Sequence, residues 1–211
     1  MTNNAILIQG SPEWHAARVG KVTASRVADV IAKTKTGWGA SRKNYAAELV
    51  AERLTGRAAE SYTNAAMQWG LDTEPQARVA YEFLMDATVV QVGLIDHPAI
   101  PMTAASPDGL IGDDGMLEIK CPITATHIET LLTRTIPDKY MVQMQWQMAC
   151  AGRAWCDYLS YDPRMPENLQ LFVKRVLRDD ARIVELETEV QTFLSEVDAT
   201  IKALRKHAEA A

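Results

Sequence analysis

The 211-residue sequence has few cysteines, no long apolar run and no overall excess of positive charge. Its three cysteines, Cys121, Cys150 and Cys156, cannot supply a four-cysteine iron–sulfur cluster, and their spacing matches neither a disulfide framework nor a zinc site. No window approaches the length of a membrane span, and no charged leader precedes an apolar run at the start. We therefore expect a cytoplasmic protein with reduced thiols, no iron–sulfur cluster and no membrane partner.

The charge is distributed unevenly along the chain. A net charge of −5 argues, taken alone, against a nucleic-acid partner, because phosphate binding usually requires a basic surface. Residues 1–57, however, contain nine Lys or Arg and four Asp or Glu, a net of +5, so the remaining residues carry −10. This split is compatible with a basic lobe that faces DNA on an acidic body, although an ordinary solvated surface can produce it too.

The hydrophobic pattern indicates one α+β domain over residues 1–211. There is no internal repeat, no low-complexity tract and no Pro- or Ser-rich linker that would mark a boundary. Apolar periodicity predicts helices near residues 42–54, 64–84, 138–150 and 179–206, and a loop over 33–41. Alternating or short apolar runs predict strands near residues 88–94, 102–105, 110–111, 116–120, 154–161 and 169–176. We expect a mixed central sheet flanked by helices.

Two carboxylates and a lysine lie within one predicted hairpin. Nine residues separate Asp108 from Glu118, which is enough for a strand, a tight turn at residues 112–115 and a returning strand. Lys120 follows Glu118 by two positions, so both side chains project from the same face of the second strand. The two carboxylates can then share one metal ion, with a cation beside them.

This set of side chains matches what phosphodiester hydrolysis requires. A hard, oxygen-bound ion such as Mg²⁺ stabilises charge on the phosphate and the leaving oxygen, and a nearby lysine can orient or deprotonate the attacking water. Taken singly, Pro-Asp-Gly is mostly a turn and Glu-x-Lys is mostly a solvated strand face. The conjunction favours chemistry, because Leu117 and Ile119 alternate with the charges in a half-buried strand.

Other polar residues are ambiguous when read alone. Glu74 is a single carboxylate on a predicted helix, and such residues usually lie on the surface. Tyr140, Gln143 and Gln147 form one stripe of a later helix at i, i+3 and i+7. They could face the same cleft, but spacing alone favours a solvated face.

Seven short motifs occur in order along the chain: WHAARVG (14–20), TAS (23–25), WGLDTE (69–74), SPDG (106–109), EIKCP (118–122), YMVQMQ (140–145) and YDPRM (161–165). Together they resemble the lambda-type exonucleases of the YqaJ-like viral recombinase family, and the likeness spans residues 11–195. The joint occurrence of the motifs in this order is far more specific than any single one.

The resemblance implies a restriction-endonuclease-like core of the PD-(D/E)xK type and assigns roles to residues of this sequence. The catalytic set would be Glu74, Asp108, Glu118 and Lys120. Asp108, Glu118 and the carbonyl of Ile119 would bind Mg²⁺, with Mn²⁺ as a substitute, and a second ion would lie near Glu74. Arg18, Ser25, Ser106 and Gln143 would bind a 5′-terminal phosphate. Residues 33–41, with Lys35 and Trp38 as a DNA-contacting loop, depart most from the family pattern.

The same resemblance implies a biological role. The protein would digest one strand of linear double-stranded DNA from 5′ to 3′, prefer 5′-phosphorylated ends, and leave a 3′ single strand for recombination by single-strand annealing. It would be encoded by a phage or prophage, act in the cytoplasm of a bacterial host, form a homotrimeric ring around double-stranded DNA ends, and work with a single-strand annealing protein.

Three other functions would share parts of this sequence pattern. A restriction-type endonuclease would share the metal core but cut internally, and the terminal-phosphate residues argue against it. A helicase- or CRISPR-associated nuclease of this fold would usually carry a four-cysteine cluster. A catalytically silent DNA-binding recombination scaffold would be expected to lose Asp108, Glu118 or Lys120, and all three are present.

Overall fold

A five-stranded mixed sheet lies at the centre of the computed structural model, which describes residues 7–59 and 64–210. The strand order is β10-β9-β8-β7-β4, and only the β8–β9 pair is parallel. The five strands are β4 (Val89–Val90), β7 (Gly109–Ile111), β8 (Gly115–Lys120), β9 (Trp155–Tyr161) and β10 (Leu171–Leu177). The predicted mixed sheet is confirmed.

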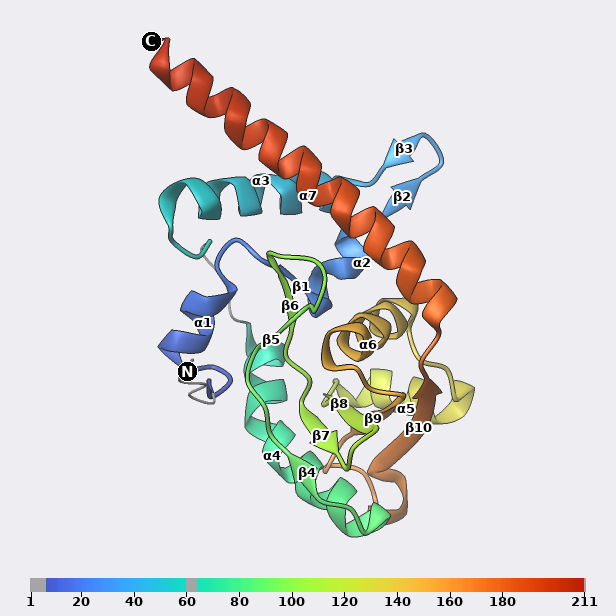
Figure 1. The fold of residues 1–211 in the computed structure, drawn as a ribbon. Helices are drawn as coiled ribbons and strands as arrows, with labels where there is room; N and C mark the ends of the chain where they lie inside the picture. Colours follow the sequence, from blue (N-terminus) through green and yellow to red (C-terminus); the bar gives the residue numbers. More distant parts are fainter. Residues whose placement is uncertain (1–6, 60–63, 211) are drawn as a thin grey trace.

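Helices cover both faces of this sheet (Figure 1). The helices of the described residues are α1 (Pro12–Arg18), α2 (Val27–Val30), α3 (Ala40–Thr55), α4 (Ala65–Met85), α5 (Thr124–Thr133), α6 (Asp138–Ala151) and α7 (Asp180–Glu209), with short 3₁₀ turns η1 (Ala24–Arg26) and η2 (Glu167–Leu169). Helix α4 runs along one face, and α5 and α6 lie on the other (Figure 1). No helix among the described residues is both long and apolar enough to cross a bilayer.

The alternation of side chains along β8 sets the direction of the charged residues. Leu117 and Ile119 point into the apolar core beneath α4, where they pack with Ala77 and Tyr81. Met116 packs on the opposite side against residues of α6. Because successive strand residues alternate faces, Glu118 and Lys120 share the side of Met116 and lie beneath α6.

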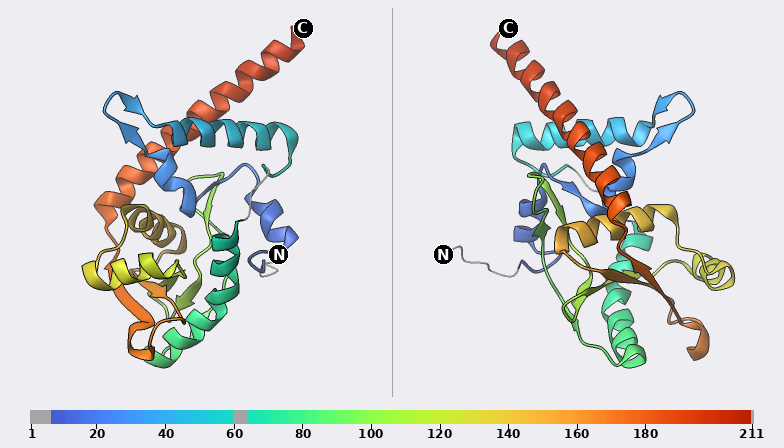
Figure 2. Two further views of the ribbon diagram at one scale, coloured as in Figure 1. Left: turned by 180° about the vertical axis from the view of Figure 1, so that it is seen from behind. Right: turned by 45° about the vertical axis from the view of Figure 1, so that its right-hand side comes forward.

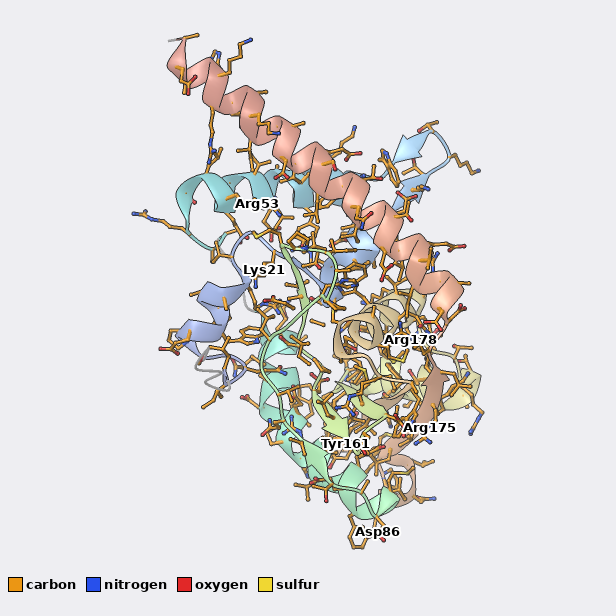
Figure 3. All side chains as sticks on the ribbon, viewed as in Figure 1. Lys21, Arg53, Asp86, Tyr161, Arg175 and Arg178 are labelled. Carbon is orange, nitrogen blue, oxygen red and sulfur yellow. The ribbon has the colours of Figure 1, made fainter. Side chains whose placement is uncertain are left out.

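A second layer holds the N-terminal region. Strands β1 (Val22–Thr23), β6 (Thr103–Ala105) and β5 (Ile95–Asp96) form a three-stranded sheet. Helices α3 and α7 pack together nearby, with Tyr45 and Phe193 stacked at 5.7 Å between ring centroids. Arg53, labelled in Figure 3, joins α3 to the Gly20 carbonyl at 2.8 Å and to Asp198 of α7 at 2.8 Å. The segment that follows α1 is thereby fixed against the helical layer.

Two local expectations are wrong. Residues 33–41 are not a plain loop, because β2 (Lys33–Thr34) and β3 (Gly37–Trp38) pair as a small hairpin and α3 begins at Ala40. This hairpin projects beside the crossing of α3 and α7 (Figure 2). Helix α5 was not predicted at all. Its exposed Ile128 and Leu132 interrupt the apolar periodicity, and its buried face includes His127 and Thr130.

Candidate active site

The hairpin of β7 and β8 brings Asp108 to the backbone of β8. Asp108 directly precedes β7, and its N–H donates to the Leu117 carbonyl at 3.2 Å. Its Oδ2 accepts from the Ile119 N–H at 2.6 Å. Gly112, at φ +52°, opens the turn between the strands. The side chain is half-buried, so one carboxylate oxygen is fixed at the edge of β8, as the spacing predicted.

Glu118 is fully buried beneath α6. Its Oε1 accepts from Gln143 Nε2 at 2.7 Å, and its Oε2 accepts from Gln147 Nε2 at 2.6 Å. Lys120 Nζ also contacts Oε1 as an ion pair. Three donors therefore converge on this carboxylate and fix its orientation.

Lys120 lies between the carboxylates and an aromatic ring. Its Nζ is 4.9 Å from the ring centroid of Tyr140. Burial lowers the pKa of Lys120, but the charges of Glu118 and Asp108 outweigh this and raise it above its ordinary value. In the absence of bound metal or DNA, the lysine is thus held in its protonated form.

Glu74 lies near the other two carboxylates but does not contact them. It is on α4, where its Oε1 accepts from Arg78 one turn later at 2.5 Å. Burial raises the pKa of Glu74, and the charge of Glu118 adds to the shift. Burial also raises the pKa of Asp108 well above its ordinary value, and Glu118 and Glu74 add to it. Several carboxyl groups therefore share a half-buried position, where burial and their mutual repulsion disfavour the ionised forms of Glu74 and Asp108.

The donor set suits a hard divalent cation. Within residues 7–59 and 64–210, no three His, Cys, Asp or Glu side chains form a complete metal cage. Mg²⁺ rarely needs one, because it is usually held by one or two carboxylates and fills its remaining positions with water and substrate phosphate. Asp108 and Glu118 provide such a pair, and a cation would offset both the burial and the repulsion that raise the Asp108 pKa.

The residues expected to bind a 5′-phosphate lie on neighbouring elements. Gln143 donates to the carboxylate of Glu118. Ser106 Oγ accepts from the indole Nε1 of Trp14 at 2.9 Å, and the guanidinium of Arg18 stacks on the same indole at 4.1 Å. Ser25 is exposed on η1, which packs against α6. The structure thus links Arg18 with Ser106 through Trp14 and places Ser25 on a turn that packs against the helix that carries Gln143.

Lys35 and Trp38 lie apart from this cluster, on the projecting β2–β3 hairpin (Figure 1). Lys35 is exposed, whereas the Trp38 ring is contacted by Arg42 at 3.8 Å and by Lys33 at 4.7 Å. The indole anchors the hairpin to α3 rather than projecting freely.

The spacing of polar residues favoured a solvated face on α6, and this prediction is wrong. The stripe of Tyr140, Gln143 and Gln147 does not face solvent: Gln143 and Gln147 bind Glu118, Tyr140 adjoins Lys120, and Gln147 is fully buried. The sequence does contain a signal for burial of this stripe. The polar residues lie among Val142, Met144 and Met148, so the helix has no separate apolar face that could be buried alone. Trp14 was also missed as a side chain of the site.

The fold and the cluster define a nuclease of the restriction-endonuclease-like class. Residues 13–154 match the model of the YqaJ-like viral recombinase domain. The chain belongs to this family and is an exodeoxyribonuclease of the kind associated with phage-type recombination.

Solved structures agree with this placement. An alkaline exonuclease from Laribacter hongkongensis, LHK-Exo, shares 55% identity with a TM-score of 0.89, over 95% of this chain and 100% of that one. The same match is found for LHK-Exo in complex with dAMP. A phage-related exonuclease from Haemophilus somnus 129PT shares the fold at 15% identity and a TM-score of 0.72, over 87% and 96% of the two chains. No curated protein matches the chain significantly.

Proposed function

We propose that this protein is a Mg²⁺-dependent exonuclease that degrades one strand of linear double-stranded DNA from 5′ to 3′. It prefers 5′-phosphorylated ends and leaves a 3′ single strand for recombination by single-strand annealing. The observation that carries the proposal is the placement of Asp108, Glu118 and Lys120 at one end of β8, beside helix α6. The structure of LHK-Exo with dAMP supports release of mononucleotides by a 55% identical relative.

The metal ligands proposed for this chain are Asp108, Glu118 and the Ile119 carbonyl, with Glu74 near a second ion. Mg²⁺ would neutralise charge on the scissile phosphate and increase the acidity of a bound water, and Mn²⁺ would substitute for it. Gln143 and Gln147 hold the carboxylate of Glu118 in a fixed orientation. Arg78 holds the carboxylate of Glu74 along α4.

Lys120 is proposed to act on the attacking water. Its ammonium now contacts Glu118, two residues away on the same strand face. A cation bound by Asp108 and Glu118 would compete for these oxygens and weaken the hold on Nζ. The lysine can then donate a hydrogen bond to the water or, if a lowered pKa lets it first release its proton to solvent, accept a proton from the water at Nζ.

The terminal phosphate is assigned to Arg18, Ser25, Ser106 and Gln143. Arg18 has no carboxylate partner among the described residues, and its side-chain hydrogen bond goes to Thr23 Oγ1 at 3.4 Å. A planar guanidinium with free donors is well suited to a phosphate. Lys35 on the projecting hairpin would contact the DNA backbone ahead of the end.

Assembly and partners follow the family. We infer a homotrimeric ring around the duplex, since a closed cyclic arrangement retains its track between cuts. A single-strand annealing protein would load on the emerging 3′ strand. The setting would be the cytoplasm of a bacterial host that carries the phage or prophage.

The test follows digestion of a linear duplex that is labelled at either end, with and without a 5′-phosphate, in Mg²⁺, in Mn²⁺ and in EDTA. We expect metal-dependent release of mononucleotides from the phosphorylated 5′ end and an intact 3′ strand. Cutting of closed circular DNA would instead indicate an endonuclease. Binding of ends without cleavage in either metal would indicate a silent recombination scaffold.

Replacement of Arg18 tests the phosphate assignment. In Arg18→Ala, the ratio of initial rates on 5′-phosphorylated and 5′-hydroxyl ends should fall by roughly 10- to 100-fold, because a charged hydrogen-bonded contact contributes about 1.5–3 kcal/mol. The exposed Arg57 of the same basic N-terminal region serves as the control, and Arg57→Ala should leave the ratio unchanged. An unaltered ratio in Arg18→Ala would remove this residue from the pocket.

A further inference from the structure

Trp14 joins two side chains that come from distant parts of the sequence. It lies on α1, where its N–H donates to the capping Ser11 Oγ at 3.2 Å. Its indole Nε1 donates to Ser106 Oγ at 2.9 Å, across 92 residues of chain. Its ring carries the guanidinium of Arg18 at 4.1 Å from the centroid. A single half-buried indole therefore contacts two of the four residues assigned to the terminal phosphate.

Arg18 differs from most of the other buried or partly buried arginines in having no carboxylate partner. Arg153 donates to the Gly112 carbonyl, and ion pairs with carboxylates are formed by Arg26, Arg42, Arg53, Arg78, Arg178 and Arg182. Arg18 forms none among the described residues, and its guanidinium is held by an aromatic face and a threonine hydroxyl. Stacking restrains the plane of the guanidinium without using its N–H donors. The donors of Arg18 remain available to an anion, in an orientation that Trp14 fixes.

The bond to Ser106 fixes which role the hydroxyl can play. A serine hydroxyl has one proton and two acceptor lone pairs. The indole N–H can only donate, so Ser106 Oγ must accept from Trp14 and keeps its own proton for another acceptor. Donation into Oγ also polarises the O–H and strengthens it as a donor. Ser106 is thus prepared to donate to an anion that is also within reach of Arg18.

We propose that Trp14 is a positioning residue for 5′-phosphate recognition, which orients Arg18 by stacking and commits Ser106 to donate its hydroxyl proton. This inference rests on the proposed terminal-phosphate pocket. Trp14 itself need not touch the phosphate. Its contribution is to hold both groups in place before the DNA end binds, so that less conformational entropy is lost on binding.

The test separates the hydrogen bond from the stack. Trp14→Phe keeps an aromatic face for Arg18 but removes the Nε1 donor, and Ser106→Ala removes the acceptor. We would measure kcat and KM on 5′-phosphorylated and 5′-hydroxyl duplexes for wild type, each single variant and the double variant, with Tm as a check on folding. Trp14→Tyr also keeps an aromatic ring and lacks the indole Nε1 donor, and it serves as a second variant in case Trp14→Phe folds poorly.

The expected result is specific to phosphorylated ends. Trp14→Phe should lower the ratio of kcat/KM on phosphorylated to hydroxyl ends by roughly three- to tenfold, mainly through KM, because one neutral hydrogen bond is lost. Once Ser106 is alanine, adding Trp14→Phe should lower the ratio little further. Trp155→Phe is the matched control, since Arg175 stacks on Trp155 at 3.5 Å in another part of the molecule. It should leave the ratio unchanged.

Each other outcome contradicts the inference in a distinguishable way. An equal loss on both kinds of end, or a loss that follows Tm, would mean that Trp14 has only a structural role. A preserved ratio in Trp14→Phe and Trp14→Tyr, with a normal preference in wild type, would overturn the role of the Trp14–Ser106 hydrogen bond, and a preserved ratio in Trp14→Leu, which lacks the ring, would overturn the role of the stack. If wild type itself does not distinguish the two ends, the phosphate pocket fails, and the role of Trp14 fails with it.

Discussion

Asp108→Asn should reduce cleavage of linear duplex DNA by at least about 10³-fold, which corresponds to roughly 4 kcal/mol of transition-state stabilisation. The substitution keeps the shape of the side chain and an oxygen that can accept from the Ile119 N–H. It removes the negative charge that a divalent ion requires. Binding of DNA ends should be largely retained, because the proposed phosphate contacts come from other residues.

Although it loses activity, the same variant should be more stable than wild type when no metal is bound. Burial and the charges of Glu118 and Glu74 raise the pKa of Asp108, so its ionised form destabilises the metal-free fold. This cost is present above the folded-state pKa and disappears as the pH falls below the unfolded value. In EDTA at pH 8, Asp108→Asn should therefore have a higher Tm than wild type. In Mg²⁺ the difference in Tm should become smaller or change sign, because only wild type is stabilised by bound metal.

Asp113→Asn is the matched control, since Asp113 is exposed in the turn of the same hairpin. It should leave both cleavage and the response of Tm to Mg²⁺ as in wild type. Glu118→Gln is a less clean probe. Gln143 and Gln147 each donate to one oxygen of Glu118, and an amide would place its own N–H₂ against one of them. Full cleavage by Asp108→Asn would remove Asp108 from the metal site.

The sequence predicted the backbone of this site because its signals are local. Asp108, the turn at Gly112 and the alternation of Leu117 to Lys120 all lie within one hairpin, where strand period and turn chemistry determine which side chains face each other. The long helices were predicted for the same reason. Asn64 caps α4 and Gly56 ends α3 in the left-handed conformation, as their residue types favour.

The environment of Glu118 could not be obtained from residue periodicity. Its partners Gln143 and Gln147 are 25 and 29 residues away, and their polarity is compatible with either solvent or a buried carboxylate. Only the packing of α6 on the sheet decides between the two. The family resemblance assigned Gln143 to the terminal phosphate rather than to Glu118 and gave no role to Gln147. The contact of Trp14 with Ser106 spans 92 residues without any signal in spacing. Long-range pairings of polar groups depend on the tertiary fold.

Lys120→Met should lower kcat by about 10²- to 10⁴-fold, the usual range for loss of a positioned proton-transfer group. Methionine keeps the apolar stem that adjoins Tyr140 and removes the ammonium from the Glu118 carboxylate. Loss of this positive charge leaves the carboxylates more available to a cation. Mg²⁺ binding, measured by calorimetry in the absence of DNA, should therefore be maintained or tightened, unlike in Asp108→Asn.

Lys139→Met provides the comparison for Lys120, because the exposed Lys139 adjoins the same Tyr140 ring at 4.7 Å. Both variants remove one positive charge and one contact with that ring. Only Lys120 touches Glu118, so kcat for Lys139→Met should stay within about twofold of wild type, the range expected for an exposed charge with no partner in the site. If the two variants lost activity equally, the loss would be due to the positive charge removed near the DNA and not to a specific role of Lys120 in the reaction. If Lys120→Met lost Mg²⁺ binding together with cleavage, the lysine would support the metal site instead of acting on the water.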